Sequence, residues 1–190
     1  MEDKLTVFKA SKFFNVSSKT IINWIEAGHI KAYKTVGGHR RIKRSDMETF
    51  MRGQGIPIPD TEIEDERKRI LVVDDDPIIV ETIVQALEED EFDYEVISAS
   101  DGFEAGLQVN HFHPHLMILD IMMPDIKGNE VCRKIKSNEA TKETKIIVLS
   151  AYLDEEKFKE MKDHGADVCF SKPLPLPQLK EEVARLLELL

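Results

Sequence analysis

The feature that most constrains the fold is an alternation of two patterns that begins near residue 69 of this 190-residue chain. Five short apolar or β-branched runs alternate with five amphipathic stretches over about 120 residues. Such alternation predicts a parallel sheet with helices on both faces. The predicted strands are Ile70–Val73, Tyr94–Ser98, Leu116–Leu119, Ile146–Leu149 and Val168–Phe170, and the predicted helices lie near 78–90, 102–110, 127–137, 154–163 and 176–189.

Polar residues follow four of these predicted strands. Asp74 and Asp75 follow the first strand, Asp120 the third, and Ser150 and Lys172 the fourth and fifth. In doubly wound sheets ligands bind beyond the carboxyl ends of the strands, so we expect these side chains to converge. Crowded carboxylates repel one another unless a cation neutralises them, and oxygen ligands without His or Cys favour Mg²⁺ over zinc. A lysine and a hydroxyl facing the carboxylates complete a cradle for a phosphoryl group.

The segments ILVVDDDP, LMILDIMMPDIKG, IIVLSA and GADVCFSKPL occur in this order. Residues 70–190 therefore resemble the receiver domains of two-component response regulators. The resemblance implies a flavodoxin-like, doubly wound sheet of five parallel strands. It also implies that a sensor histidine kinase phosphorylates Asp120, and that Ser150 and Lys172 contact the phosphoryl group. The Mg²⁺ ligands that it implies are Asp75, Asp120, the Met122 backbone carbonyl and, mainly through water, Asp74.

The chain departs from the family pattern three residues before this lysine, where an aromatic residue is common. The residue here is Cys169, so the usual aromatic switch and the dimer face beside it are not implied unchanged. We expect Cys169 to be a small buried filler, and Asp76 to cap the following helix. The apolar or bulky neighbours of the site, Met122 and Tyr152, predict a long-lived phosphoryl state.

Charge divides the chain into two parts. Residues 1–52 carry 11 Lys and Arg against 5 Asp and Glu, a net charge of +6, whereas residues 53–190 carry 15 against 31, a net charge of −16. This asymmetry predicts a polyanion partner for the basic part and cation binding or solvation for the acidic part. The alternative is an ordinary polarised surface.

The basic part is predicted to form two short helices, a glycine-bearing hairpin and a third helix opened by a capping box at Ser45. Its segments VSSKTIINWIEAGHI and GGHRRI resemble the winged helix of the MerR/excisionase type. The resemblance implies double-stranded DNA as partner, Ser18–Ala27 as recognition helix and Gly37–Arg41 as wing, while the phase of Trp24 favours the core. The candidate DNA-contacting residues are Ser18, Lys19, Thr20, Ile22, Asn23, Lys34, His39, Arg40, Arg41 and Lys43.

These observations predict a winged helix-turn-helix domain over 1–52, a linker over 53–69 and a receiver domain over 70–190. The linker is too short to form a coiled coil alone. The sequence leaves open whether a homodimer forms through the receivers or only on DNA. No apolar run approaches the ~20 residues that a membrane span needs, and the two cysteines lack pairing or zinc spacing, so we expect a cytoplasmic protein. The His111–His115 segment is expected in a solvated loop, with a metal site as the alternative.

The leading hypothesis is a DNA-binding response regulator whose DNA binding and transcriptional effect are modulated by phosphorylation of Asp120. The alternative is a phospho-switched adaptor or scaffold that acts through protein contacts, with an architectural basic domain. An enzyme acting on external phosphate esters is not expected, because Asp120-Ile121-Met122 lacks the second carboxylate of an Asp-x-Asp pair. The expected chemistry is confined to self-phosphorylation from a phosphodonor and slow autodephosphorylation.

Overall fold

The computed structural model describes residues 4–34, 40–58, 67–90, 92, 94–124, 128–151 and 154–189. The chain forms two compact units, one from residues within 1–66 with the short segment 89–93, the other from residues 67–88 and 94–190. Three predictions lie wholly or partly outside the described residues: the wing tip at 37–39, residues 59–66 of the linker, and Tyr152.

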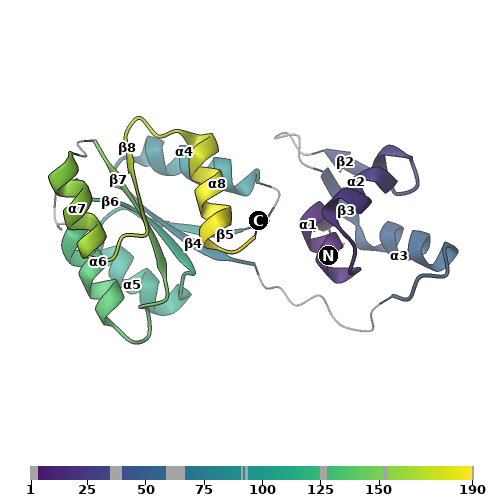
Figure 1. Ribbon diagram of the computed structural model, residues 1–190, viewed down its shortest axis with the longest axis horizontal. Coiled ribbons are helices and arrows are strands. Elements are labelled where there is room, and N and C mark those ends of the chain that lie inside the picture. The colour runs from purple at the N-terminus through teal and green to yellow at the C-terminus, as the bar shows by residue number, and fades with distance from the viewer. Residues whose placement is uncertain are drawn as a thin grey trace. The chain divides into compact units, whose positions relative to one another are not determined.

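The second unit is the predicted sheet of five parallel strands, in the order β5-β4-β6-β7-β8 (Figure 1). Its strands are β4 (Arg69–Val73), β5 (Glu95–Ala99), β6 (Leu116–Asp120), β7 (Lys145–Ser150) and β8 (Val168–Ser171). Its helices are α4 (Pro77–Glu88), α5 (Gly102–Phe112), α6 (Gly128–Ser137), α7 (Glu155–Asp163) and α8 (Leu176–Leu186). The strand order reverses between β4 and β6, which makes their carboxyl ends the topological switch point of the sheet.

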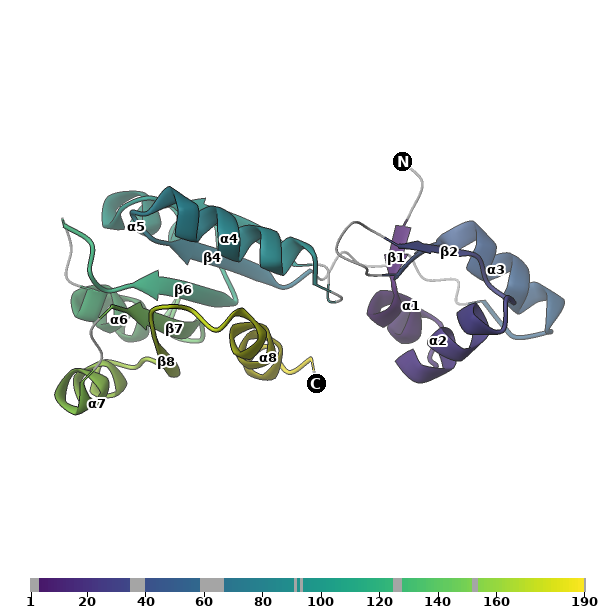
Figure 2. The same ribbon diagram turned by 90° about the horizontal axis from the view of Figure 1, so that it is seen from above.

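Helices cover both faces of this sheet, which explains why its strands read as continuous apolar runs. On one face Leu71 and Val73 join a buried cluster with residues of α5, α6 and α7. The alternate residues Ile70 and Val72, also fully buried, point to the opposite face because successive strand side chains alternate. There α4 and α8 pack together, and Figure 2 shows α4 lying along β4. The strands thus hold the loops at their carboxyl ends on a rigid base.

The first unit contains an antiparallel sheet of three strands in the order β1-β3-β2, with three helices. Its elements are β1 (Lys4–Thr6), α1 (Val7–Phe13), α2 (Ser18–Glu26), β2 (Ala32–Lys34), β3 (Arg40–Lys43) and α3 (Arg44–Gly53). The two helices, the hairpin strands and the third helix agree with the prediction. The strand β1 was not predicted, because three residues are too few to show an alternating pattern.

The core of the first unit is an apolar cluster that includes the fully buried Ile21, Ile42 and Met47. Trp24 packs against this cluster, with its ring centroid 5.0 Å from that of Phe50, as its helical phase predicted.

Two of the predicted helix starts can be compared with the structure. The sequence offers Ser17 or Ser18 as the cap of α2, and the structure shows Ser17, whose hydroxyl accepts a hydrogen bond from the Thr20 backbone N–H at 3.0 Å. The capping box predicted at Ser45 is wrong. The helix α3 begins at Arg44, two residues earlier than this box implies, and its N-cap Lys43 makes no side-chain hydrogen bond.

Candidate functional site

Three carboxylates converge where β4 and β6 end. Asp74 directly follows β4, Asp75 is the next residue, and Asp120 is the last residue of β6. One ligand oxygen from each lies within 4.8 Å of the others, and among the described residues this is the group of acidic, His or Cys side chains that could hold a metal ion. Asp74 and Asp120 are 1% and 4% exposed, whereas Asp75 is exposed. The parallel register brings these side chains together because Val73 and Leu119 are paired neighbours.

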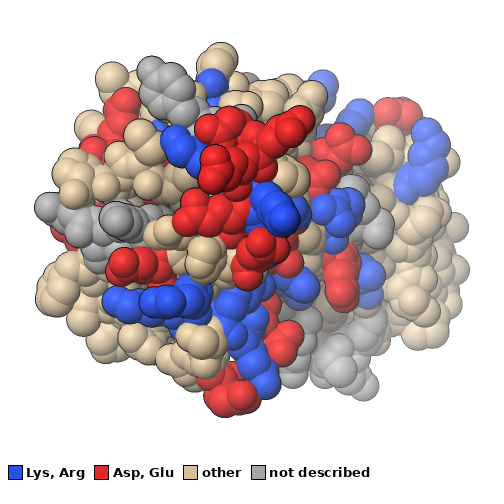
Figure 3. Space-filling view, turned by 60° about the vertical axis from the view of Figure 1, so that its left-hand side comes forward, with Lys and Arg blue, Asp and Glu red and all other residues tan. Residues whose placement is uncertain are grey.

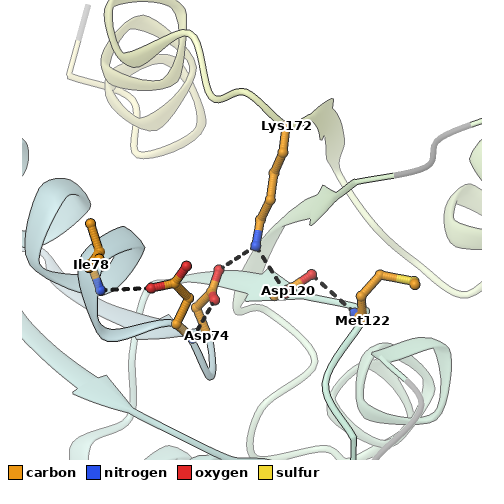
Figure 4. A network of polar contacts seen from close by, with 6 residues as sticks. Asp74, Ile78, Asp120, Met122 and Lys172 are labelled. Atoms are coloured by element: carbon orange, nitrogen blue, oxygen red, sulfur yellow. Dashed lines mark hydrogen bonds and ion pairs between the residues drawn. The ribbon is translucent and has the colours of Figure 1, made fainter.

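Lys172 supplies the counter-charge for the two buried carboxylates (Figure 4). Its Nζ donates hydrogen bonds to Asp74 Oδ2 at 2.8 Å and to Asp120 Oδ2 at 3.0 Å. Burial alone would lower the pKa of Lys172, but the bonds to both carboxylates outweigh it and raise that pKa. Lys172 therefore remains a cation throughout the physiological range.

Burial has a clear effect on the pKa of Asp74. Desolvation raises the pKa of Asp74, and the nearby charge of Asp120 adds to this rise. Hydrogen bonds from Lys172 and from the Asp76 backbone N–H, the latter at 2.9 Å, oppose the rise without cancelling it. The buried pair is thus a site where added positive charge would be stabilised.

Backbone turns orient the side chains of the cluster. The Met122 backbone N–H donates a hydrogen bond to Asp120 Oδ1 at 3.0 Å (Figure 4). The backbone of Met122 therefore lies beside Asp120, the carboxylate with which its carbonyl was predicted to share a Mg²⁺ ion. The Met122 side chain is 50% exposed. Asp76 Oδ1 accepts the Ile78 backbone N–H at 2.9 Å, at the start of α4, in agreement with its predicted capping role.

The remaining predicted residue of this site, Ser150, is the last residue of β7 and is fully buried. Its carbonyl oxygen accepts the Lys172 backbone N–H at 2.8 Å, which ties the ends of β7 and β8 together. Cys169 on β8 is half-buried and packs against the apolar cluster, and burial raises the pKa of its thiol. This environment agrees with the prediction of a filler.

Surface charge by itself would not identify this site. Figure 3 shows acidic side chains gathered in a patch on the visible face, with Lys and Arg side chains around it. The cluster of Asp74, Asp75 and Asp120 differs because two of its carboxylates are buried beside each other. Its donors are all oxygens and its third carboxylate is accessible, so the residues present fit a hard divalent cation such as Mg²⁺.

The predicted DNA-contacting residues of α2 fall into two groups. Lys19 and Asn23 are exposed on one side of the helix. The other group is half-buried and consists of Ser18, Thr20 and Ile22. Ile22 packs against the apolar cluster. The Ser18 hydroxyl lies 3.2 Å from Ser11 Oγ, and the Thr20 hydroxyl lies 2.8 Å from Ser17 Oγ. The exposed surface of α2 is thus narrower than predicted.

The basic residues of the hairpin are divided between the two faces of the small sheet. Arg40 alternates with Arg41 along β3 and lies on the same face as Ile42, which is fully buried in the core. Lys34 is paired with Arg40 and shares this face, whereas Arg41 and Lys43 belong to the other face. His39 lies outside the described residues.

Sequence reasoning missed Glu26, which is the last residue of α2 and is exposed. Its Oε1 accepts a hydrogen bond from Arg40 Nη2 at 3.0 Å. The available signal was its spacing, since Lys19, Asn23 and Glu26 follow one another at i, i+4 and i+7 on one helix face.

The histidines of the 111–115 segment do not lie together in the loop that was predicted. The helix α5 extends to Phe112, so His111 is helical, and His113 forms its left-handed C-cap with φ of 47°. His115 Nδ1 accepts the Arg69 backbone N–H at 3.0 Å. The metal alternative thus has no support among the described residues.

Two family profiles match the chain. The response regulator receiver domain matches residues 70–184, and a helix-turn-helix domain matches residues 5–55. No helix among the described residues is both long and apolar enough to cross a bilayer.

Relatives and solved structures resemble the second unit. The DNA-binding response regulator MtrA of Mycolicibacterium smegmatis is 37% identical over 119 residues, covering 63% of this chain and 49% of that protein. Protein PilG of Pseudomonas aeruginosa is 34% identical over 114 residues, covering 58% of this chain and 81% of that protein. The chain spans about half the length of MtrA and of the regulator RpaA of Synechocystis. The crystal structure of the signal receiver domain of a DNA-binding response regulator from Colwellia psychrerythraea has a TM-score of 0.61 at 29% identity, covering 63% of this chain and 98% of that one.

Proposed function

Because this chain belongs to the response regulator receiver family, we propose that it is a DNA-binding regulator controlled by phosphorylation of Asp120. In this proposal a receiver domain over 70–190 senses the signal, and a winged helix-turn-helix domain over 1–52 binds duplex DNA. The observation that carries the proposal is the buried Asp120 carboxylate, 3.0 Å from the Lys172 ammonium and adjacent to two further carboxylates at the switch point of the sheet.

Asp120 is suited to be the nucleophile. One of its oxygens attacks the phosphorus of a phosphohistidine on a sensor kinase, a P–O bond forms, and the P–N bond breaks as the imidazole leaves. Asp120 is almost buried, so the acyl phosphate would form in a site from which most water is excluded. Lys172 would then lie within reach of a phosphoryl oxygen, and the Ser150 hydroxyl would turn toward another.

Mg²⁺ would be held by Asp75 and Asp120 directly, by the Met122 carbonyl and, through water, by Asp74. When bound, it neutralises charge on the phosphoryl oxygens and on the carboxylates. The buried pair of Asp74 and Asp120 with the exposed Asp75 supports this assignment, since three carboxylates lie together and Lys172 forms ion pairs with two of them. No external substrate would be turned over, because the group that is modified is the protein's own side chain.

The first unit would bind duplex DNA. The exposed Lys19 and Asn23 of α2 present a donor cation and an amide, the side chains that contact phosphates and adenine edges. The basic residues Lys34, Arg41 and Lys43 of β2 and β3 would add phosphate contacts, Arg40 would add a further contact to the DNA, and His39 would join them from the wing. A sensor kinase and DNA are therefore the proposed partners, and a homodimer would bind paired half-sites spaced by whole helical turns.

Incubation with Mg²⁺ and acetyl phosphate, followed by mass spectrometry, tests the chemistry of the receiver. We expect one phosphoryl group per chain, an acyl phosphate labile in base, and no product with Asp120→Asn. The matched control Glu139→Gln removes an exposed carboxylate elsewhere and should be phosphorylated like the parent chain. Phosphorylation of Asp120→Asn to the parent level would refute the assignment.

A further inference from the structure

The exposed face of α2 carries an acidic residue where a helix that binds a polyanion would be expected to carry none. Glu26 follows Lys19 and Asn23 on this face, and all three are exposed. Residues 1–52 hold only 5 acidic residues against 11 basic ones. A carboxylate on this face would repel phosphates and weaken non-specific binding to DNA.

Helix stability does not account for Glu26. It is the final residue of α2, where the helix dipole disfavours a negative charge, and the last turn of α2 contains no basic residue. The charge of Glu26 is met instead by Arg40, at the start of β3, whose Nη2 lies 3.0 Å from Glu26 Oε1. This ion pair joins the end of α2 to the base of the hairpin.

The ion pair directs Arg40 toward α2. Arg40 shares the helix-facing side of the sheet with the buried Ile42, whereas Arg41 belongs to the opposite face. An arginine beside a carboxylate is partly neutralised and is a poorer ligand for a phosphate than a free one. Its remaining guanidinium N–H groups keep their planar, forked geometry.

We infer that Glu26 and Arg40 together read one G·C base pair, an inference that rests on the proposed function. In the major groove guanine presents two acceptors, O6 and N7, and cytosine presents one donor, the N4 amino group. The Arg40 guanidinium offers donors to guanine, and the second carboxylate oxygen of Glu26, Oε2, offers an acceptor to cytosine. Arg40 contacts the base, and Glu26 also acts as its positioning residue.

The inference is tested with the full chain on its selected DNA site, with each base pair replaced in turn. We expect Arg40→Lys, which keeps the charge but loses the fork, to lower discrimination at one G·C position by about 5- to 150-fold. Glu26→Ala should lower discrimination at the same position and raise affinity for unrelated duplexes, because it removes a negative charge. Neither variant should change preference at the other positions.

Two controls separate this reading from the alternatives. Glu48→Ala removes a carboxylate on α3 that pairs with Arg44 and Arg52, and it should leave the base preference unchanged. If Arg40→Lys keeps the full preference at every position, Arg40 reads no base, and the inference is overturned while the proposed function stands. If the parent chain binds no duplex with sequence preference, the proposed function fails and the inference falls with it. Circular dichroism of each variant checks that the first unit remains folded.

Discussion

Replacing Asp75 by Asn should make the receiver more stable, although it removes a polar residue from the functional site. Asp75 lies within 4.8 Å of both Asp74 and Asp120, measured between ligand oxygens. At this distance two unit charges repel by about 1 kcal/mol in water and by about 3.5 kcal/mol at an effective dielectric constant of about 20. Asp75 is exposed, so the lower value of about 1 kcal/mol applies to its repulsion with Asp74 and to its repulsion with Asp120. The positive charge of Lys172 offsets part of this total repulsion. We expect a net gain of about 1 kcal/mol without Mg²⁺.

Differential scanning calorimetry of the full chain, with and without Mg²⁺, measures this gain in the transition of the second unit. The midpoint for Asp75→Asn should rise by several degrees in the absence of Mg²⁺. The parent chain should gain further stability from saturating Mg²⁺, by about 2.7 kcal/mol at a concentration 100 times the dissociation constant, and the variant should lose most of this gain. Glu139→Gln is the control for removing one surface charge. A variant that is less stable than the parent without Mg²⁺, or that gains as much from Mg²⁺, would refute the reasoning.

Two further predictions concern stability away from the carboxylates. Gly165→Ala should destabilise the second unit by more than about 2 kcal/mol, because φ is +98° and the new Cβ would lie 2.6 Å from Lys136 Cγ. Gly28→Ala should destabilise the first unit by only about 1 kcal/mol, since φ is +74° and no atom lies within 4 Å of the new Cβ. Urea unfolding of each unit measures both losses of stability, and equal losses would contradict the predicted clash at Gly165. Burial raises the pKa of Cys132 to about 12, so this thiol stays protonated in the folded chain while the unfolded chain ionises near 9, and stability should fall as pH rises above 9. Between pH 9 and 10 the parent should lose about 1 kcal/mol more than Cys132→Ala, and parallel pH profiles would show that the thiol is not the cause.

The candidate site of the receiver could be predicted from the sequence because it depends on strand ends. Each apolar run stops at a polar residue, and in a parallel sheet all carboxyl ends meet at one edge. The sequence alone therefore predicts that Asp74, Asp120, Ser150 and Lys172 lie together. Which of these side chains are buried could not be predicted from the sequence. The difference between the buried Asp74 and the exposed Asp75 depends on how the turn after β4 directs each side chain.

The structure of the first unit was less predictable, because its features depend on strand register and on short elements. The strand β1 has three residues and can be recognised as a strand only from its pairing with β3. The side of the sheet on which Arg40 lies follows from the pairing of β2 with β3, and a shift of one residue would exchange Arg40 with Arg41. The ion pair of Arg40 with Glu26 joins residues 14 positions apart and has no local sequence signal.

DNA affinity with and without a phosphoryl mimic tests the central claim most directly. The full chain and Asp120→Ala are titrated with a selected duplex over a range of salt concentrations, in Mg²⁺ alone and in Mg²⁺ with beryllofluoride. We predict that beryllofluoride changes the affinity of the parent chain and leaves that of Asp120→Ala unchanged. Equal affinity of the parent chain with and without the mimic, at every salt concentration, would contradict the account, because DNA binding would then be independent of the state of Asp120.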